Sequence, residues 1–196
     1  RAICEDDEGL LWIGTRNSGI VRVNQDRLTY NFFNYLTHNE KLDESKQVKK
    51  IYKDNRANIW IGTRNGVYCY DPATTAIKHF TTRTQPSIPS NWVYAISEDD
   101  NGIVWIDTWN GVASYNFKTD SIITHRIENI NSVRDIAKGK NGGVWVATEN
   151  GLVFLNYRIE NEMVVILEAT HYEHLENQNS INNDFIYSVD VDEDGN

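Results

Sequence analysis

Four residues that could contact a ligand occupy the same place in four repeated segments. Arg16, Arg64, Trp109 and Glu149 each stand four residues after a tryptophan and directly before an asparagine. Arginine offers bidentate donors to hydroxyl or carboxylate groups, and tryptophan offers a flat stacking surface. Glycoside or lyase chemistry would need a pair of carboxylate or histidine groups, and among these four positions only Glu149 supplies one. These residue types therefore favour sugar binding over catalysis.

The residues around these positions are repeated. The anchors are Trp12, Trp60, Trp105 and Trp145, and each is followed by a threonine three residues later and by a glycine after the asparagine. Anchors spaced roughly 40 to 50 residues apart are typical of propeller blades or solenoid coils. Because positions that fold the unit recur, positions that differ between copies are free to bind.

Each repeat is predicted to form four antiparallel strands. The first opens at a valine twelve residues before the anchor (Val48, Val93 and Val133), and the second carries the tryptophan. Asn–Gly then predicts a tight hairpin with positive φ at both turn residues. Third strands are expected at 20–24, 67–70, 112–115 and 152–155, and fourth strands at 28–35, 76–81, 121–127 and 163–172. The expected fold is all-β, with four four-stranded antiparallel propeller blades.

The two ends of the chain repeat internal segments. Residues 2–6 match 95–99, and residues 180–189 match 87–96. Residues 1–196 are therefore expected to be a single β-propeller segment of about four repeats that begins and ends within a repeat. Since propellers close a ring of four to eight blades, this segment is interpreted as an arc of a larger propeller, with a closed four-bladed ring as the alternative.

The predicted topology gives the blades two different faces. Acidic turns after the first strands lie on one face, while the Asn–Gly hairpins and the linkers between blades lie on the other. Trp92 and Trp109 are off the repeat anchor, so neither fills the shared core position. The candidate ligand-binding residues of the hairpin face are Arg16, Asn17, Arg64, Asn65, Asn91, Trp92, Trp109 and Asn110.

Several other classes of site are not expected. The net charge of −9 and the absence of a basic stripe argue against a nucleic-acid partner. The acidic turn at 190–195 resembles half a calcium loop, but other repeats place lysine or arginine there, so no metal is expected. His171 and His174 would point to opposite faces of a strand. No phosphate loop or nucleophile elbow is present, and no cofactor or catalytic residue is expected.

The repeat resembles a known family. Residues 87–112 read Ser-Ile-Pro-Ser-Asn-Trp-Val-Tyr-Ala-Ile-Ser-Glu-Asp-Asp-Asn-Gly-Ile-Val-Trp-Ile-Asp-Thr-Trp-Asn-Gly-Val, a pattern similar to the two-component regulator propeller repeat. All four copies carry it. Two copies depart from the usual Trp-Ile-Gly-Thr by placing Asp107 and Ala147 where the family has glycine.

The resemblance implies a function. In that family such repeats form the periplasmic sensor region of Bacteroidetes-type hybrid two-component histidine kinases, with seven-bladed rings, and characterised relatives bind oligosaccharides. The chain is therefore expected to be a non-enzymatic, extracytoplasmic segment that recognises an oligosaccharide or other small extracellular ligand. It would signal to kinase domains outside this chain.

The implied partners are the rest of the parent sensor, a second copy if the sensor is a homodimer, and the membrane only through the parent. Two alternatives stay open. One is a protein-protein interaction propeller without a small ligand, and the other is a propeller glycosidase or lyase.

Overall fold

The computed structural model describes residues 2–24, 29–32, 47–130, 132–140, 142–176 and 179–192. Sixteen strands in these ranges form four four-stranded antiparallel sheets, which confirms the expected all-β propeller blades. Each sheet follows chain order, because every strand pairs with the next one along the chain. Within the described ranges no helix is long and apolar enough to cross a membrane.

The blades are numbered in chain order. Blade 1 consists of β1 (Ala2–Glu5), β2 (Leu10–Gly14), β3 (Ile20–Asn24) and β4 (Thr29–Phe32). Blade 2 consists of β5 (Lys50–Lys53), β6 (Ile59–Thr63), β7 (Gly66–Tyr70) and β8 (Ile77–Phe80). Blade 3 consists of β9 (Val93–Glu98), β10 (Ile103–Thr108), β11 (Gly111–Asn116) and β12 (Ser121–His125). Blade 4 consists of β13 (Val133–Gly139), β14 (Gly143–Thr148), β15 (Gly151–Glu160) and β16 (Met163–Tyr172).

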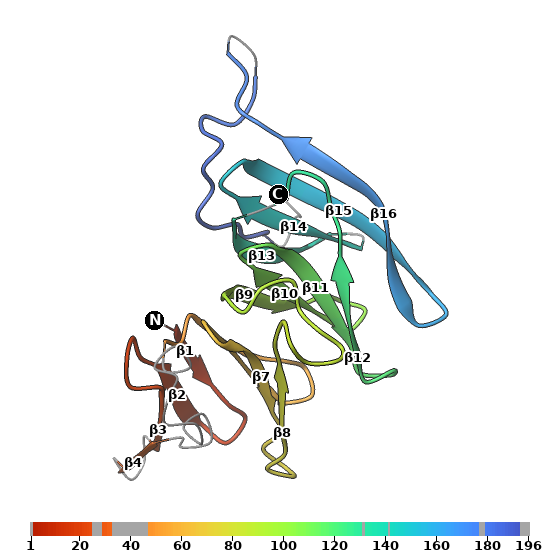
Figure 1. Ribbon diagram of the computed structural model, residues 1–196. Helices are drawn as coiled ribbons and strands as arrows, with labels where there is room; N and C mark the ends of the chain where they lie inside the picture. The colour runs from red at the N-terminus through yellow and green to blue at the C-terminus, as the bar shows by residue number, and fades with distance from the viewer. Residues whose placement is uncertain are drawn as a thin grey trace.

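The blades stand in a row. Figure 1 shows them in chain order, from the red strands of blade 1 to the blue strand of blade 4. The first strands are neighbours, since β1 contacts β5, β5 contacts β9 and β9 contacts β13. The described blades thus form an open arc and not a closed four-bladed ring. Its membership of a larger, seven-bladed propeller stays a prediction.

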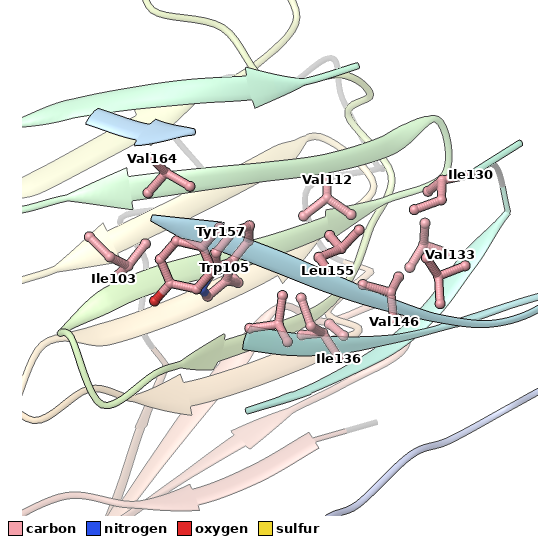
Figure 2. Packing of buried hydrophobic residues seen from close by; sticks show 13 residues of the cluster. Ile103, Trp105, Val112, Ile130, Val133, Ile136, Val146, Leu155, Tyr157 and Val164 are labelled. Atoms are coloured by element: carbon pink, nitrogen blue, oxygen red, sulfur yellow. The ribbon is translucent and has the colours of Figure 1, made fainter. Parts of the chain in front are cut away.

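The anchor tryptophans pack each blade on the next. Trp12, Trp60 and Trp105 are fully buried and belong to three separate clusters, one at each interface between blades. Figure 2 shows the cluster between blades 3 and 4. In this cluster the Trp105 and Tyr157 rings lie edge to face, with their centroids 5.1 Å apart. The fourth anchor, Trp145, also faces away from the preceding blade, but it is only half-buried, because no further blade follows blade 4 in the described structure. Its ring packs on Phe154 and Tyr172 of its own sheet.

The acidic turns hold these tryptophans in place. The carboxylates of Asp6, Asp54 and Asp99 accept the indole N–H of the tryptophan six residues later, at 2.7, 2.8 and 2.6 Å. Each also accepts backbone N–H groups of its own turn. Blade 4 has Gly139 at this place. In these three turns the aspartate therefore stabilises the fold by accepting hydrogen bonds from the turn and from the anchor tryptophan.

The Asn–Gly hairpins differ in geometry from the expected turn. Only the glycines have positive φ, with values of 95°, 121° and 110° at Gly66, Gly111 and Gly151. The glycine is already the first residue of the next strand, paired with threonine, so the two turn residues are the variable residue and the asparagine. A Cβ at Gly66 would lie 2.2 Å from the carbonyl oxygen of Phe80, which excludes any larger residue. The hairpin tip therefore presents the residue that varies between repeats.

Most strand limits agree with expectation to within two residues. The expected strand at 28–35 is β4, with 28 and 33–35 outside the described residues. The expected strand at 152–155 is longer, because β15 runs to Glu160 beside the equally long β16. Residues 180–189, which copy the start of a repeat, form no strand in the described structure. Ile186 N–H nevertheless bonds the Thr148 carbonyl at 2.9 Å, as Val48 bonds Thr15 at 3.2 Å.

Candidate ligand-binding face

Backbone hydrogen bonds tie the linkers between blades to the Asn–Gly hairpins. Gly66 N–H donates to the Asn91 carbonyl at 2.8 Å, and Gly151 N–H donates to the Asp184 carbonyl at 2.6 Å. Trp109 N–H donates to the Trp92 carbonyl at 2.9 Å. Hairpin tips and linkers therefore share one face, as the topology predicted. We call it the hairpin face.

Aromatic rings gather on this face between blades 3 and 4. Trp92 and Trp109 meet edge-on with ring centroids 5.9 Å apart, and Tyr94 lies 6.1 Å from Trp109. Phe185, from the segment after blade 4, contacts the same arginine as Tyr94 and Trp109 do. Trp92 is 37% exposed and Trp109 is half-buried. We call Trp92, Tyr94, Trp109 and Phe185 the aromatic cluster.

Two arginines face these rings. The guanidinium of Arg64 lies 4.6 Å from the centre of the Trp92 ring. Arg134 lies 5.4 Å from each of Tyr94, Trp109 and Phe185, so it sits at the centre of the cluster. Arg134 also forms an ion pair with Glu149. Arginine stacked on an aromatic ring keeps its edge N–H donors available for a ligand.

A polar pocket of about 440 Å³ lies beside the cluster, between blades 1 and 2. Its lining residues are Arg16, Asn17, Gln47, Val48, Lys49 and Arg64. Three of the six are cations and none is acidic. Arg64 belongs both to this basic pocket and to the aromatic cluster, and Lys49 lies 5.9 Å from the Tyr94 ring. The two features are therefore continuous along the face.

The burial and positive charge of this pocket change the pKa of Lys49. Partial burial lowers the pKa of its ammonium, and the positive charges of Arg64, Arg16 and Arg134 lower that pKa further. Among the described residues, no carboxylate forms an ion pair with Arg16, Lys49 or Arg64. Within the described residues, the pocket thus concentrates positive charge that no ion pair compensates, in a chain of net charge −9.

The structure separates the eight candidate residues into two groups. Arg16, Asn17, Arg64, Trp92 and Trp109 lie in the basic pocket or the aromatic cluster. The three other asparagines do not. The Asn91 side chain accepts the Thr82 N–H at 2.8 Å, Asn65 lies beside Tyr68, and Asn110 lines a separate surface pocket with Pro89 and His125. Whether any of the eight binds a ligand stays a prediction.

Four residues of this face were not predicted from the sequence: Lys49, Tyr94, Arg134 and Phe185. A signal was present for the first three, because each directly follows one of the repeated valines and each differs from its equivalents. In blades 3 and 4 this place is also irregular, since the pairing register shifts at Tyr94 and at Arg134. The irregularity leaves these side chains outside the regular ladder, directed at the hairpin face.

The first strands of blades 2, 3 and 4 line a second pocket, which is mainly acidic. It measures about 470 Å³ and lies along β5, β9, β13 and residues 188–191. Its charged lining residues are Lys50, Glu98, Asp99, Asp100, Asp135, Lys138 and Asp190. Ser188 Oγ donates to Asp135 at 2.6 Å, and Lys138 donates to Asp100 at 2.8 Å. Acids predominate here and are engaged with neighbours. This pocket offers little to an anionic ligand.

Comparison with known proteins finds a family whose repeat matches three segments of this chain. The profile described as "Two component regulator propeller" matches residues 1–17, 87–110 and 128–150. These three segments, in blades 1, 3 and 4, match two-component regulator propeller repeats. A solved structure with the same fold is the extracellular domain of a putative hybrid two component system from B. thetaiotaomicron. Its TM-score is 0.78 at 23% identity, over 100% of this chain and 25% of that one.

Other similar proteins include a kinase and an enzyme. "Histidine kinase P4" of Formosa agariphila is 29% identical over 79 residues, which is 39% of this chain and 6% of the kinase. Virginiamycin B lyase from Staphylococcus aureus shares the fold with a TM-score of 0.65 at 18% identity, over 90% of this chain and 56% of the lyase. The propeller repeats described here thus span a small part of the kinase and about a quarter of the extracellular domain.

Proposed function

We propose that this chain is the ligand-sensing part of a two-component signalling protein and that it binds an oligosaccharide on the hairpin face. The observation that carries the proposal is the aromatic cluster, in which exposed Trp92 and half-buried Trp109 stand beside Arg64 and Arg134. Sugar rings stack on tryptophan through their apolar C–H faces, while guanidinium groups bind the hydroxyl or acidic groups around the ring.

The repeat pattern supports binding at this place. Trp109 stands where the other blades have arginine or glutamate, and Trp92 has Phe185 as its equivalent in the segment after blade 4. Neither residue fills the core position, which the buried anchor tryptophans occupy. A pair of aromatic side chains that the fold does not require, on a face rich in cations, favours a ligand as the reason for their presence.

The signalling role is proposed from the family. Proteins similar to this chain are an extracellular domain of a putative hybrid two component system and a histidine kinase. We infer that the chain lies outside the cytoplasm, in the periplasm, and that it transmits ligand binding to kinase domains elsewhere in the parent sensor. The parent, alone or as a homodimer, is the proposed protein partner.

The proposal assigns no catalytic step to this segment. Glu149, the acidic residue of the hairpin tips, is paired with Arg134 and not with a second carboxylate. His125 is buried with its Nε2 on Ser114 at 2.7 Å, and burial lowers its pKa to about 4. His79 bonds the Asn65 carbonyl at 2.7 Å and stacks on Tyr68. Each of these potential acid–base groups is engaged in a structural contact.

Titration of an oligosaccharide array and calorimetry on the intact protein that contains this chain test the proposal. Trp109→Ala removes the central ring of the aromatic cluster, and we expect it to weaken oligosaccharide binding by about 1 to 3 kcal/mol. Trp109→Phe keeps an aromatic face and is expected to retain part of the affinity. No sugar should be cleaved during the titration.

Tyr172→Ala is the matched control. Tyr172 is also aromatic and 43% exposed, but it lies on β16 at the outer edge of blade 4. We expect wild-type affinity from this variant. Equal affinities of Trp109→Ala and wild type would move the sugar site away from the aromatic cluster. Binding of no oligosaccharide at all would favour the protein-interaction propeller instead.

A further inference from the structure

We infer that the ligand carries a carboxylate or sulfate group and that the basic pocket of Arg16, Lys49 and Arg64 binds it. This inference rests on the proposed function and narrows the ligand from oligosaccharides in general to acidic oligosaccharides. The pocket and the aromatic cluster share Arg64, so a ligand stacked on the rings can place a charged substituent in the pocket.

The positive charge of the pocket has no counterpart in the described structure. Elsewhere on the surface three lysines pair with acids, including Lys53 with Asp7 at 2.6 Å and Lys138 with Asp100 at 2.8 Å. The three cations of the pocket come from different segments. Arg16 and Arg64 lie at the hairpin tips of blades 1 and 2, and Lys49 directly precedes β5. The fold thus brings like charges together at a cost that an anion would offset.

The chemistry of the donors favours a carboxylate or sulfate. A guanidinium presents two parallel N–H groups to the oxygens of a planar or tetrahedral anion, and an ammonium adds a compact charge. The Nε atom of Arg64 is buried and has no hydrogen-bond partner among the described residues, while stacking on Trp92 fixes the plane of the guanidinium. A neutral sugar would leave the charges of all three side chains uncompensated.

Partial burial strengthens the effect. Lys49 is half-buried beside Tyr94, and the neighbouring arginines already lower its pKa. An anion bound in the pocket would reverse this shift, because it stabilises the charged ammonium. Attraction between a ligand anion and partly desolvated cations also exceeds the attraction between fully hydrated charges.

The test compares acidic and neutral oligosaccharides on the intact protein. Calorimetry uses trigalacturonic acid, its methyl ester, a sulfated chondroitin disaccharide, the desulfated disaccharide and uncharged maltotriose, after an array has ranked acidic and neutral glycans. We expect an acidic ligand to bind at least about tenfold more tightly than its neutral counterpart. The uronate and sulfate pairs show which anion the pocket prefers. Raising the salt concentration should weaken only acidic binding.

Charge-removing variants locate the contact. Lys49→Gln and Arg16→Gln should each lower affinity for the acidic ligand about tenfold and leave neutral ligands unaffected. Lys138→Gln, which removes a lysine charge from the other pocket, is the matched control and should behave as wild type. Arg16 is an exposed tip residue, so its variant separates lost binding from misfolding.

Failure of the inference can be distinguished from failure of the proposed function. Equal affinity for charged and neutral oligosaccharides, unchanged in Lys49→Gln and Arg16→Gln, would overturn the inference and leave the proposed function standing. Binding of no glycan of either kind would overturn the proposed function, and the inference with it. Preference for acidic glycans that persists in both variants would show that the anion binds elsewhere.

Discussion

The two faces of the blades use charged residues in opposite ways. On the face of the acidic turns, Asp6, Asp54 and Asp99 accept hydrogen bonds from backbone N–H groups and from the anchor tryptophans. On the hairpin face, Arg16 and Lys49 have no acidic partner among the described residues. Charged groups on one face stabilise the fold, while those on the other, apart from the Arg134–Glu149 ion pair, have no acidic partner among the described residues.

The difference between the two faces follows from which positions of the repeat are constant and which vary. A turn aspartate six residues before the tryptophan recurs in three blades, and each copy makes the same bond. The residue four after the tryptophan changes from arginine to tryptophan to glutamate, and its surroundings change with it. A repeated side chain is therefore expected to matter for stability, and a variable one for binding. Substitutions of tryptophans and turn aspartates test this distinction.

The largest effect on stability is expected from an anchor tryptophan. Trp60→Ala should lower the free energy of unfolding by about 3 to 5 kcal/mol, because it empties a fully buried site that contacts Tyr115 and Phe117 of the next blade. Trp109→Ala removes an equally large ring from the hairpin face and should cost about 1 kcal/mol. Urea unfolding of the intact protein measures both. Equal losses would remove the distinction between repeated and variable tryptophans.

A smaller loss is expected from the turn that holds the anchor. Asp54→Ala leaves the indole N–H of Trp60 and the side chain of buried Asn58 without their acceptor, which should cost about 2 to 3 kcal/mol. The control is Asp100→Ala, which removes an exposed carboxylate paired with Lys138 and should change stability by less than about 0.5 kcal/mol. If both variants melted alike, the turn aspartates would be ordinary surface acids.

The repeat made the fold predictable. β3 lies at the predicted 20–24 and β16 at the predicted 163–172, because apolar runs and Asn–Gly turns recur in register with the anchors. The half-burial of Trp145 was not predictable from its own repeat, since burial depends on what packs against the outer side of blade 4. Local pattern sets the strands, while burial depends on the neighbouring sheet.

The candidate site was predictable only in part. Arg64, Trp92 and Trp109 were found because they break the repeat. Lys49 was not predicted, because its place in the pocket depends on the contact between two blades and not on its own hairpin. The ion pair of Arg134 with Glu149 joins residues 15 apart, and nothing in their spacing indicates it. Asn91 was included although its side chain serves the linker.

Asp107 breaks the repeat without reaching the surface. Its equivalents are Gly14, Gly62 and Ala147, and a Cβ on either glycine would lie within 2.9 Å of a valine of the next blade. Asp107 is fully buried, and neither carboxylate oxygen has a hydrogen-bond partner in the described part of the chain. Variation in the repeat therefore marks a binding residue only when the side chain also reaches a face.

A small change in stability, of opposite sign to the losses above, is expected at this buried carboxyl. Burial raises the pKa of Asp107 well above its usual range, and the charge of Asp135 raises it further while Lys50 opposes. A raised folded-state pKa contributes stability that is complete below the unfolded value of about 4 and is lost as pH rises through the folded pKa. Wild type should therefore weaken above about pH 4 relative to Asp107→Ala, which cannot ionise. We expect the variant to be about 1 kcal/mol more stable at neutral pH, with Asp107→Asn as the isosteric control that removes the same pH dependence. Urea midpoints measured from pH 4 to 8 decide the matter, because a gap between wild type and Asp107→Ala that does not change with pH would mean that Asp107 does not titrate on folding.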